Sequence, residues 1–275
     1  MECAGLELLV RQSGPADGRP WLFLHAAGET SKAFAGVAAA LGRRGQTVVV
    51  PDMPGCGASE GFSAGQPGID DYASVIGALL AEIPSRSWIV YGRHFGARVA
   101  IGLATAKPEA VSCILLDGIG RYSRQERARM RRHAAPLVVP DTDGAYLMKA
   151  FQRVRDYALF FPWFDRTAKA RRACGLPAPE TVHERLVEVL ASSAGIRDAY
   201  LAALDYPAEQ ALANLQPRLI LCRRSDDNVP DSAPALEKLR PDLVTVDLDK
   251  GTADDVADQL MQVVSGVVCT AGVAT

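Results

Sequence analysis

The stretch Trp88-Ile-Val-Tyr-Gly-Arg-His-Phe-Gly-Ala-Arg-Val-Ala100 decides the fold of this chain. An apolar run typical of a buried strand enters a turn flanked by Gly92 and Gly96, and the chain leaves as an apolar helix. The turn has the frame Gly-x-nucleophile-x-Gly, which raises one side chain above a parallel sheet. At the raised position stands His94, where this frame usually carries Ser, Cys or Asp. The sequence therefore predicts a strand, turn and helix with a histidine at the chemical centre.

Strand and helix patterns alternate on both sides of this unit. Short apolar runs predict buried strands at Trp21–Leu24, Thr47–Val50, Cys113–Asp117, Arg218–Cys222 and Leu243–Asp247. Apolar residues recur at helical spacing in Ser31–Gly42, Ile69–Ile83, Ala97–Ala106 and Ala253–Val268. This alternation predicts an α/β fold with a mostly parallel, doubly wound sheet. At the start of the chain, we expect Leu6–Arg11 to form a hairpin with Trp21–Leu24.

The alternation stops in the middle of the chain. Arg121–Tyr206 offers helical patterns but no apolar strand comparable to the others. We therefore expect a helical cap at 120–210, inserted into a sheet domain made of residues 1–119 and 211–275. The aromatic run Tyr157–Phe164 suits the underside of a cap, so Trp163 is expected to contact a substrate there.

Composition narrows the classes of function. The 275 residues are 48% hydrophobic and 23% charged, and the formal charge of −2 gives no reason to expect a nucleic-acid partner. Without a signal-peptide pattern or an apolar run of about 18 residues, we expect no membrane partner and a cytoplasmic location. The six cysteines lack the spacing of metal ligands, so no metal is expected, and Cys113 and Cys222 are predicted to be core thiols.

Four landmarks together resemble the α/β-hydrolase superfamily, in particular its small single-cap esterases, lactonases and C–C-bond hydrolases. In chain order they are Leu24-His-Ala-Ala27, Pro51–Ser59, Gly92–Gly96 and Leu219–Pro230. The resemblance covers nearly the whole chain. It implies an α/β-hydrolase fold, an elbow at His94, and an oxyanion hole formed by the backbone amides of Ala27 and Phe95. In this family His25 usually braces the oxyanion loop, although we also consider it for substrate binding.

The chain departs from the family at two of the three triad positions. Thr252 stands where the catalytic histidine is expected, and a threonine hydroxyl has too high a pKa to shuttle protons at neutral pH. By the family's Asp-x-x-Val-Pro spacing, Asp226 aligns with the triad acid. Ser59 lies in a Gly-x-Ser-x-Gly string, but that string follows the wrong strand, so Ser59 is expected to brace its loop.

These residues suggest a hypothesis for the chemistry. His94 and Asp226 would form a dyad in which the carboxylate fixes the ring tautomer and raises its basicity. Beside a backbone oxyanion hole, such a base suits proton abstraction, water activation, retro-aldol or elimination steps on a small carbonyl or ester-like substrate, without a cofactor. Arg93 flanks the elbow and could pair with a substrate carboxylate.

Two alternatives to this hypothesis stay open. In the first, the protein is a non-catalytic ligand-binding or scaffold protein, which a filled site with His94 packed among apolar atoms would favour. In the second, the protein is a hydrolase whose base is a cap histidine, which requires His133 or His183 near His94. A cavity under the cap, with His94 bonded to a carboxylate, would favour the enzyme. The oligomeric state is also open, with a homodimer among the options.

Overall fold

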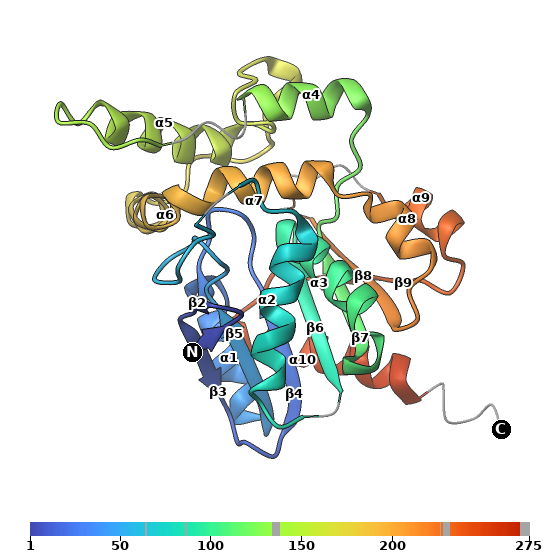
Figure 1. The fold of residues 1–275 in the computed structure, drawn as a ribbon. Helices are drawn as coiled ribbons and strands as arrows, with labels where there is room; N and C mark the ends of the chain where they lie inside the picture. Colours follow the sequence, from blue (N-terminus) through green and yellow to red (C-terminus); the bar gives the residue numbers. More distant parts are fainter. Residues whose placement is uncertain (64, 86, 134–137, 226, 228–231, 270–275) are drawn as a thin grey trace.

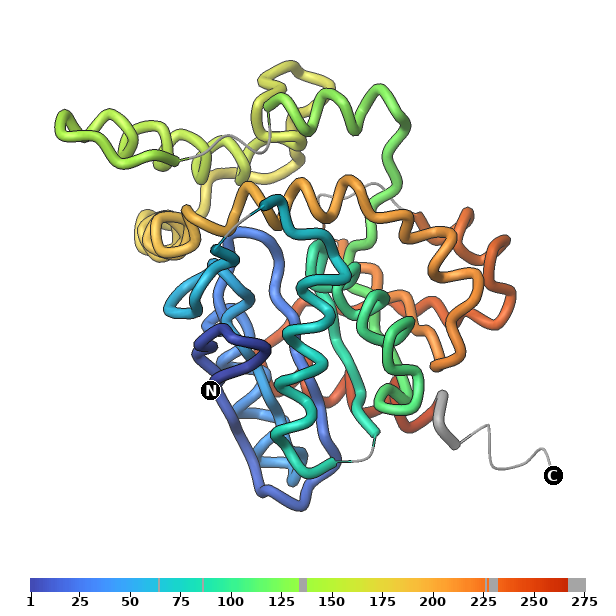
Figure 2. The backbone as a smooth tube through the Cα atoms, in the orientation of Figure 1, coloured from blue at the N-terminus to red at the C-terminus, as the bar shows by residue number. Residues whose placement is uncertain are grey.

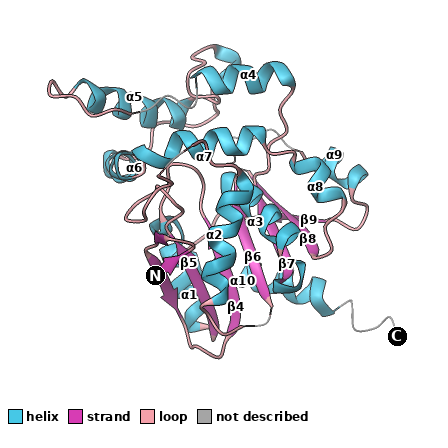
Figure 3. Ribbon diagram, viewed as in Figure 1, coloured by secondary structure: helices cyan, strands magenta, loops and turns pink. Residues whose placement is uncertain are grey.

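A twisted sheet between two helical layers forms the body of the protein in a computed structural model (Figure 1, Figure 3). The structure describes residues 1–63, 65–85, 87–133, 138–225, 227 and 232–269. Within these residues the sheet has seven strands in the order β3-β5-β4-β6-β7-β8-β9. Their bounds in chain order are Val10–Ser13, Arg19–Leu24, Gln46–Pro51, Trp88–Arg93, Val111–Asp117, Arg218–Arg224 and Val244–Leu248. All neighbouring strands are parallel except β3 and β5. The predicted fold class is thus confirmed.

The expected opening hairpin is wrong. β3 pairs antiparallel with β5, and β4 lies on the far side of β5, between β5 and β6. The small hairpin at the N-terminus instead joins β1 (Glu2–Cys3) to β2 (Leu6–Glu7). Strand β5 is apolar along most of its length, so it gains more by lying between two strands than by leaving β3 and β4 paired with each other.

The sheet is buried on both faces because its strands carry apolar residues at successive positions. In β6, Trp88 and Val90 pack into the core on one face, and Ile89 and Tyr91 pack into the core on the other. Cys113 and Cys222 are buried in the second core, as predicted. Helices α2 (Ile69–Ala81) and α3 (Phe95–Ala106) cover one face. Helices α1 (Ala35–Arg43) and α10 (Ala253–Cys269) pack side by side on the opposite face.

A group of helices lies above the carboxyl ends of the strands (Figure 1). The chain rises from β7 into these helices and returns to the sheet through α7, as the backbone tube in Figure 2 shows. Four helices, which we call the cap, make up this part: α4 (Arg124–His133), α5 (Ala145–Leu159), α6 (Pro179–Ala191) and α7 (Ser193–Asp205). Two shorter helices follow at the edge of the sheet: α8 (Ala208–Ala213) and α9 (Ala233–Leu239).

Close backbone contact attaches the cap to the sheet domain. The amide of Gly195 at the start of α7 donates to the carbonyl of Gly55 at 3.0 Å, and a Cβ on Gly195 would lie 2.6 Å from that oxygen. The Ser192 hydroxyl also donates to the carbonyl of Glu29 at 3.3 Å. The base of the cap is therefore held directly over the loops that follow β5 and β4.

Candidate functional site

The elbow between β6 and α3 holds His94 in a backbone conformation that L-residues rarely adopt. Its φ is 51° and its ψ is −102°, and its amide donates to the carbonyl of Asp117 at 2.8 Å. Glycines make the turn possible on both sides: a Cβ on Gly96 would lie 2.1 Å from the Leu24 carbonyl oxygen, and one on Gly92 would lie 2.5 Å from the Gly96 oxygen. Such a conformation costs about 1–3 kcal/mol, and the surrounding structure maintains it here.

The raised imidazole is paired with a carboxylate. His94 Nε2 lies 3.0 Å from Oδ1 of Asp227, which follows β8, and the two side chains are 23% and 15% exposed. Asp226, the carboxylate that the family spacing predicts, lies outside the described residues. A one-residue shift in the turn after β8 is too small for sequence spacing to detect, so Asp227 was missed although it is adjacent.

Gly118 provides the space in which this pair forms. It follows β7 with φ 74°, and a Cβ there would lie 2.3 Å from Asp227 Oδ2 and 2.6 Å from His94 Cδ2. Every other residue would therefore clash with both members of the pair. The absence of a side chain at 118 is as much a part of the site as the two side chains that meet over it.

Two backbone amides beside His94 are free to bind an oxygen atom. Ala27 lies in the loop after β4, and Phe95 is the first residue of α3, where helix amides have no acceptor within the helix. Among the described residues, neither amide donates to a protein acceptor. The amino end of α3 also carries the positive end of the helix dipole. The arrangement suits a developing negative charge on an oxygen.

His25 braces the oxyanion loop from within the core. It is fully buried; its Nδ1 donates to the Ala26 carbonyl at 2.9 Å and its Nε2 accepts from the Met53 amide at 2.8 Å. Burial lowers the pKa of this imidazole, although the bond to Ala26 opposes the change. With both ring nitrogens occupied by backbone, His25 has a structural place in the loop, and this corrects the expectation that it contacts a substrate.

Arg93 lines the cavity beneath the cap, but its charge is already matched. Its Nε donates to Asp117 Oδ2 at 3.1 Å, its Nη1 lies 3.5 Å from Glu29 Oε1, and its guanidinium stacks on Phe34 at 4.8 Å. Burial opposes the charge, yet Glu29 and Asp117 outweigh it and raise the pKa of Arg93. Asp117 is itself buried and also accepts from the Tyr91 hydroxyl. Arg93 thus belongs to a fixed charge network in the cavity wall.

The described residues form a cavity of about 260 Å³ under the cap, which we call the main cavity. Its wall is rich in charge, with arginines 93, 153, 172, 185 and 224 and the carboxylates of Glu29, Asp117, Glu188 and Asp227. A smaller cavity of about 60 Å³ adjoins it and is mainly apolar, with Phe95, Met130, Phe161 and Leu204 in its wall. Ala27, His94, Tyr157 and Tyr200 line both, so His94 stands where the two cavities meet.

Trp163 lines neither of these two cavities, and its contact with a substrate stays a prediction. Its ring packs 5.5 Å from the guanidinium of Arg153, which does line the main cavity. Sequence reasoning missed Arg153 because an arginine in an amphipathic helix resembles any solvated one, and nothing in its spacing indicates burial.

The cap histidines do not enter the site. His133 and His183 are exposed and line neither cavity; the His133 ring packs 5.0 Å from Phe164. The hypothesis that one of them replaces the missing triad histidine therefore lacks the required proximity. Ser59 braces its loop as predicted, since its hydroxyl donates to the Asp52 carbonyl at 2.7 Å and accepts from the Leu9 amide at 3.0 Å.

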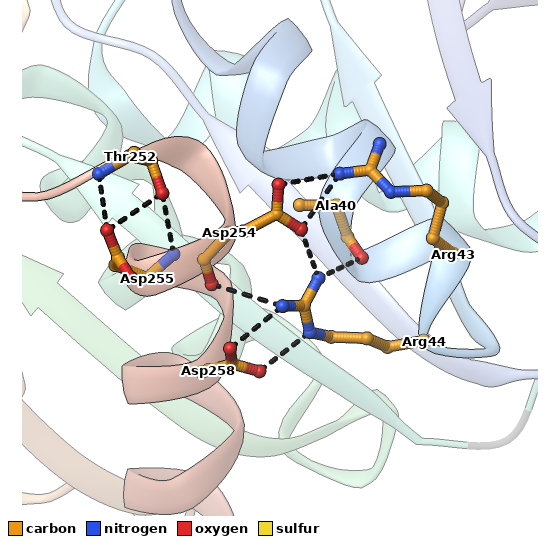
Figure 4. A network of polar contacts seen from close by, with 7 residues as sticks. All are labelled: Ala40, Arg43, Arg44, Thr252, Asp254, Asp255 and Asp258. Atoms are coloured by element: carbon orange, nitrogen blue, oxygen red, sulfur yellow. Dashed lines mark hydrogen bonds and ion pairs between the residues drawn. The ribbon is translucent and has the colours of Figure 1, made fainter.

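Thr252 caps a helix where the family has its catalytic histidine (Figure 4). Its hydroxyl accepts from the Asp255 amide at 3.2 Å, and the Asp255 carboxylate accepts from the Thr252 amide and hydroxyl, both at 2.8 Å. This is a capping box at the start of α10. Thr252 is exposed and lines neither cavity, so it takes no part in the site.

Within the described residues, no cluster of three or more His, Cys, Asp or Glu side chains could hold a metal ion.

Comparison with known proteins agrees with the fold. A family model for the alpha/beta hydrolase fold matches residues 20–251. The chain belongs to the α/β-hydrolase fold family. Among proteins of known sequence, it is 31% identical over 99 residues to the magnesium-chelatase 30 kDa subunit of Rhodobacter capsulatus. That match covers 36% of this chain and only 34% of the subunit.

Solved structures of several hydrolases share the fold across almost their whole length. A carboxylesterase structure from Nitrososphaera gargenis is 16% identical with a TM-score of 0.72, covering 96% of both chains. The enol-lactonase of Burkholderia xenovorans LB400 is 16% identical with a TM-score of 0.71, covering 98% of this chain and 99% of that one. An esterase from Rhodococcus sp. ECU1013 is 20% identical with a TM-score of 0.68, covering 96% and 95%. At such identities the likeness establishes the fold and leaves the chemistry to be argued from the site.

Proposed function

We propose that this protein is a cofactor-independent enzyme that acts on a small carbonyl or ester-like substrate, with His94 as general base. The observation that carries the proposal is the 3.0 Å contact between His94 Nε2 and Asp227 Oδ1 at the meeting point of two cavities. In this proposal a dyad of His94 and Asp227 replaces the Ser-His-Asp relay of serine hydrolases. The amides of Ala27 and Phe95 serve as the oxyanion hole.

The pairing assigns the two nitrogens of the ring. A carboxylate accepts hydrogen bonds, so Asp227 holds the proton on Nε2 and leaves the lone pair on Nδ1. Among the described residues Nδ1 has no protein hydrogen-bond partner, and His94 lines both cavities. Nδ1 is therefore the atom that would take a proton from a substrate or from water.

The proton and charge movements follow from these positions. A substrate carbonyl oxygen would accept from the amides of Ala27 and Phe95, while Nδ1 removes a proton from the adjacent carbon or from a water molecule. The electrons move onto the carbonyl oxygen as an enolate or a tetrahedral oxyanion, which the two amides stabilise. The imidazolium that forms lies against the Asp227 carboxylate and can return the proton to the product. These steps suit lyase, isomerase or non-covalent hydrolase chemistry.

The site favours this proposal over a ligand-binding or scaffold role. A scaffold protein has no need of a strained elbow, and a filled site would leave His94 packed among apolar atoms. Here the elbow keeps its positive φ, the ring meets a carboxylate, and a cavity adjoins both. The exposed positions of His133 and His183 weigh against a hydrolase that uses a cap histidine.

The test combines a substrate screen with matched histidine variants. Esters, lactones and ketones are supplied in D₂O, and turnover and exchange of the proton beside the carbonyl are followed by NMR. We expect His94→Ala to lower kcat by about 10²- to 10⁴-fold, while His133→Ala and His183→Ala leave it unchanged. Asp227→Asn should lower kcat as well, because the amide no longer holds the required tautomer.

Several outcomes would contradict the proposal. Full turnover by His94→Ala would rule out this base. A loss of turnover in Asp226→Asn with none in Asp227→Asn would move the dyad to the neighbouring carboxylate. Covalent labelling of the wild-type site by a fluorophosphonate would indicate a serine nucleophile. A wild-type protein inert towards the whole screen would favour the ligand-binding role.

A further inference from the structure

Arg153 is a buried cation that has no anionic partner in the part of the chain that the structure describes. It lies on α5, is 5% exposed and lines the main cavity. Its guanidinium packs against two aromatic rings, 5.5 Å from the Trp163 centroid and 5.4 Å from the Tyr200 centroid. Among the described residues it forms no ion pair, and its buried Nη1 has no hydrogen-bond partner. A charge in this position is unusual because burial of an unpaired ion is strongly unfavourable.

The carboxylate of Asp156 lies nearby on the same helix, but it is bonded to other arginines. Asp156, one turn further along α5, is buried and accepts from Arg155 through Oδ1 and from Arg166 through Oδ2. The stacked rings attract the Arg153 cation but do not neutralise it. The positive charge of Arg153 can therefore pair with an anionic group that enters the main cavity.

We propose that Arg153 binds a carboxylate of the substrate, so that the natural substrate is a small carbonyl compound that is also an organic acid. This inference rests on the proposed function, because it adds a binding group to the same cavity. The ring contacts involve the π faces of Trp163 and Tyr200 and leave Nη1 of Arg153 without a hydrogen-bond partner among the described residues. A planar carboxylate can accept parallel hydrogen bonds from the edge of a guanidinium. Arg172 and Arg185 in the same wall add positive potential.

The carboxylates in the wall of the main cavity are bonded to groups other than Arg153. Glu29 and Asp117 pair with Arg93, and Asp227 pairs with His94. Glu188 accepts from the Thr30 hydroxyl at 2.8 Å, and burial raises its pKa. A substrate bound through Arg153 would place its carboxylate under the cap and its carbonyl towards His94, with the apolar cavity open to a hydrocarbon substituent.

The test measures binding separately from turnover. The probes are a series of linear oxo-acids with the carbonyl at increasing distance from the carboxylate, and the methyl ester of each. Binding to the His94→Ala protein is followed by calorimetry. We expect at least one oxo-acid to bind, its methyl ester to bind about 10- to 100-fold more weakly, and Arg153→Met to weaken the acid to the level of the ester. Arg155→Met, on the same helix but outside the cavity, should leave binding unchanged.

A second measurement separates binding from a structural role. Methionine can pack against the two rings without a charge, so Arg153→Met should raise the melting temperature of the ligand-free protein. A structural arginine would give a lower one. Arg155→Met should lower the melting temperature because it removes a partner of buried Asp156.

The outcomes distinguish the two proposals. The inference is overturned if Arg153→Met binds the acids as tightly as the parent, if the esters bind as tightly as the acids, or if no oxo-acid binds. The proposed function fails on its own if acids bind through Arg153 while His94→Ala retains full turnover of a confirmed substrate.

Discussion

At the scale of single residues, the proposed function would reverse the roles that the two imidazole nitrogens take in a serine hydrolase. There the acid holds Nδ1 and the base is Nε2. In this chain the ring comes from the elbow itself, so its outer nitrogen, Nε2, reaches Asp227 and the inner one is left for chemistry. Nδ1 is one bond further from Cβ than a serine oxygen would be. A base in this position lies beside the oxyanion hole without a separate nucleophile.

Gly118 offers a direct test of this pairing. Gly118→Ala places a Cβ within 2.3 Å of Asp227 Oδ2, so we expect the His94–Asp227 contact to break and kcat to fall at least as far as in Asp227→Asn. The matched control is Gly45→Ala: its φ of 76° is close to the 74° of Gly118, but nothing lies within 4 Å of the added Cβ. Both variants should lose about 1 kcal/mol or more of stability to backbone strain. Equal activity in the two variants would contradict the account.

His25 predicts how stability depends on pH. Burial lowers the pKa of its imidazole from the ordinary value of 6.5. Below pH 6.5 the unfolded chain therefore binds a proton that the folded chain excludes, and the free energy of unfolding falls as the pH decreases towards the folded pKa. Urea denaturation between about pH 7.5 and 5.5 measures this slope. His25→Gln should be less stable at neutral pH and show a shallower slope, and an unchanged slope would assign the effect to another group.

At the scale of elements, the amino end of α10 is secured in two ways. Thr252 and Asp255 form its capping box. Arg43, the last residue of α1, and Arg44, which follows it, bind Asp254, and Arg44 also binds Asp258 (Figure 4). These ion pairs are exposed, so each contributes little. The capping box contributes more to stability, and it fixes the start of α10, which covers one face of the sheet.

Replacement of the capping threonine should lower stability without affecting activity. Thr252→Ala is expected to cost about 0.5–2 kcal/mol, because the Asp255 amide loses its acceptor. Thr105→Ala is the control, since the exposed Thr105 hydroxyl bonds to the Ile101 carbonyl and to the Tyr206 side chain and caps no helix amide, and it should change stability less than Thr252→Ala. Denaturant titration measures both. A drop in kcat for Thr252→Ala would show that position 252 still serves the site.

At the scale of the whole molecule, the two cores of the sheet contrast with a thin core in the cap. Within the described residues, the buried apolar cluster between α4 and α7 consists of Met130 and Leu204, with Tyr122, Phe164 and Tyr200 around it. Figure 1 shows α4 and α5 as the helices furthest from the sheet, whereas α7 is anchored through Gly195. Few buried contacts imply easy local opening.

Hydrogen exchange should reveal this gradient. Amides of α4 and α5 are expected to exchange much faster than those of β4, β5, β6 and β7, with α7 between the two groups. Mass spectrometry on peptic peptides gives the comparison. Equal protection of the outer cap helices and the central strands would mean that the cap unfolds only with the whole protein.

The described residues include no helix that is both long enough and apolar enough to cross a lipid bilayer.

Much of this architecture could be predicted because local patterns carried it. The apolar runs identified the strands from β4 onward, and the glycines around His94 identified the elbow. The partner of β3 could not be predicted, since pairing depends on which distant strand inserts between neighbours. Asp227 and Arg153 were missed for related reasons: one is a single-residue difference in a turn, and the other differs from solvated arginines only by its surroundings.

The helix cap formed by Thr252 also bears on how this chain could be converted into a serine hydrolase. Such a conversion needs a serine at 94 and a histidine at 252, and neither substitution completes the triad without the other. A histidine at 252 would remove the hydroxyl that caps α10, and a serine at 94 would leave Asp227 without its ring. Each single substitution therefore removes an existing interaction without creating a complete triad. Because Thr252 caps α10, conversion into a serine hydrolase would also lower the stability of the protein.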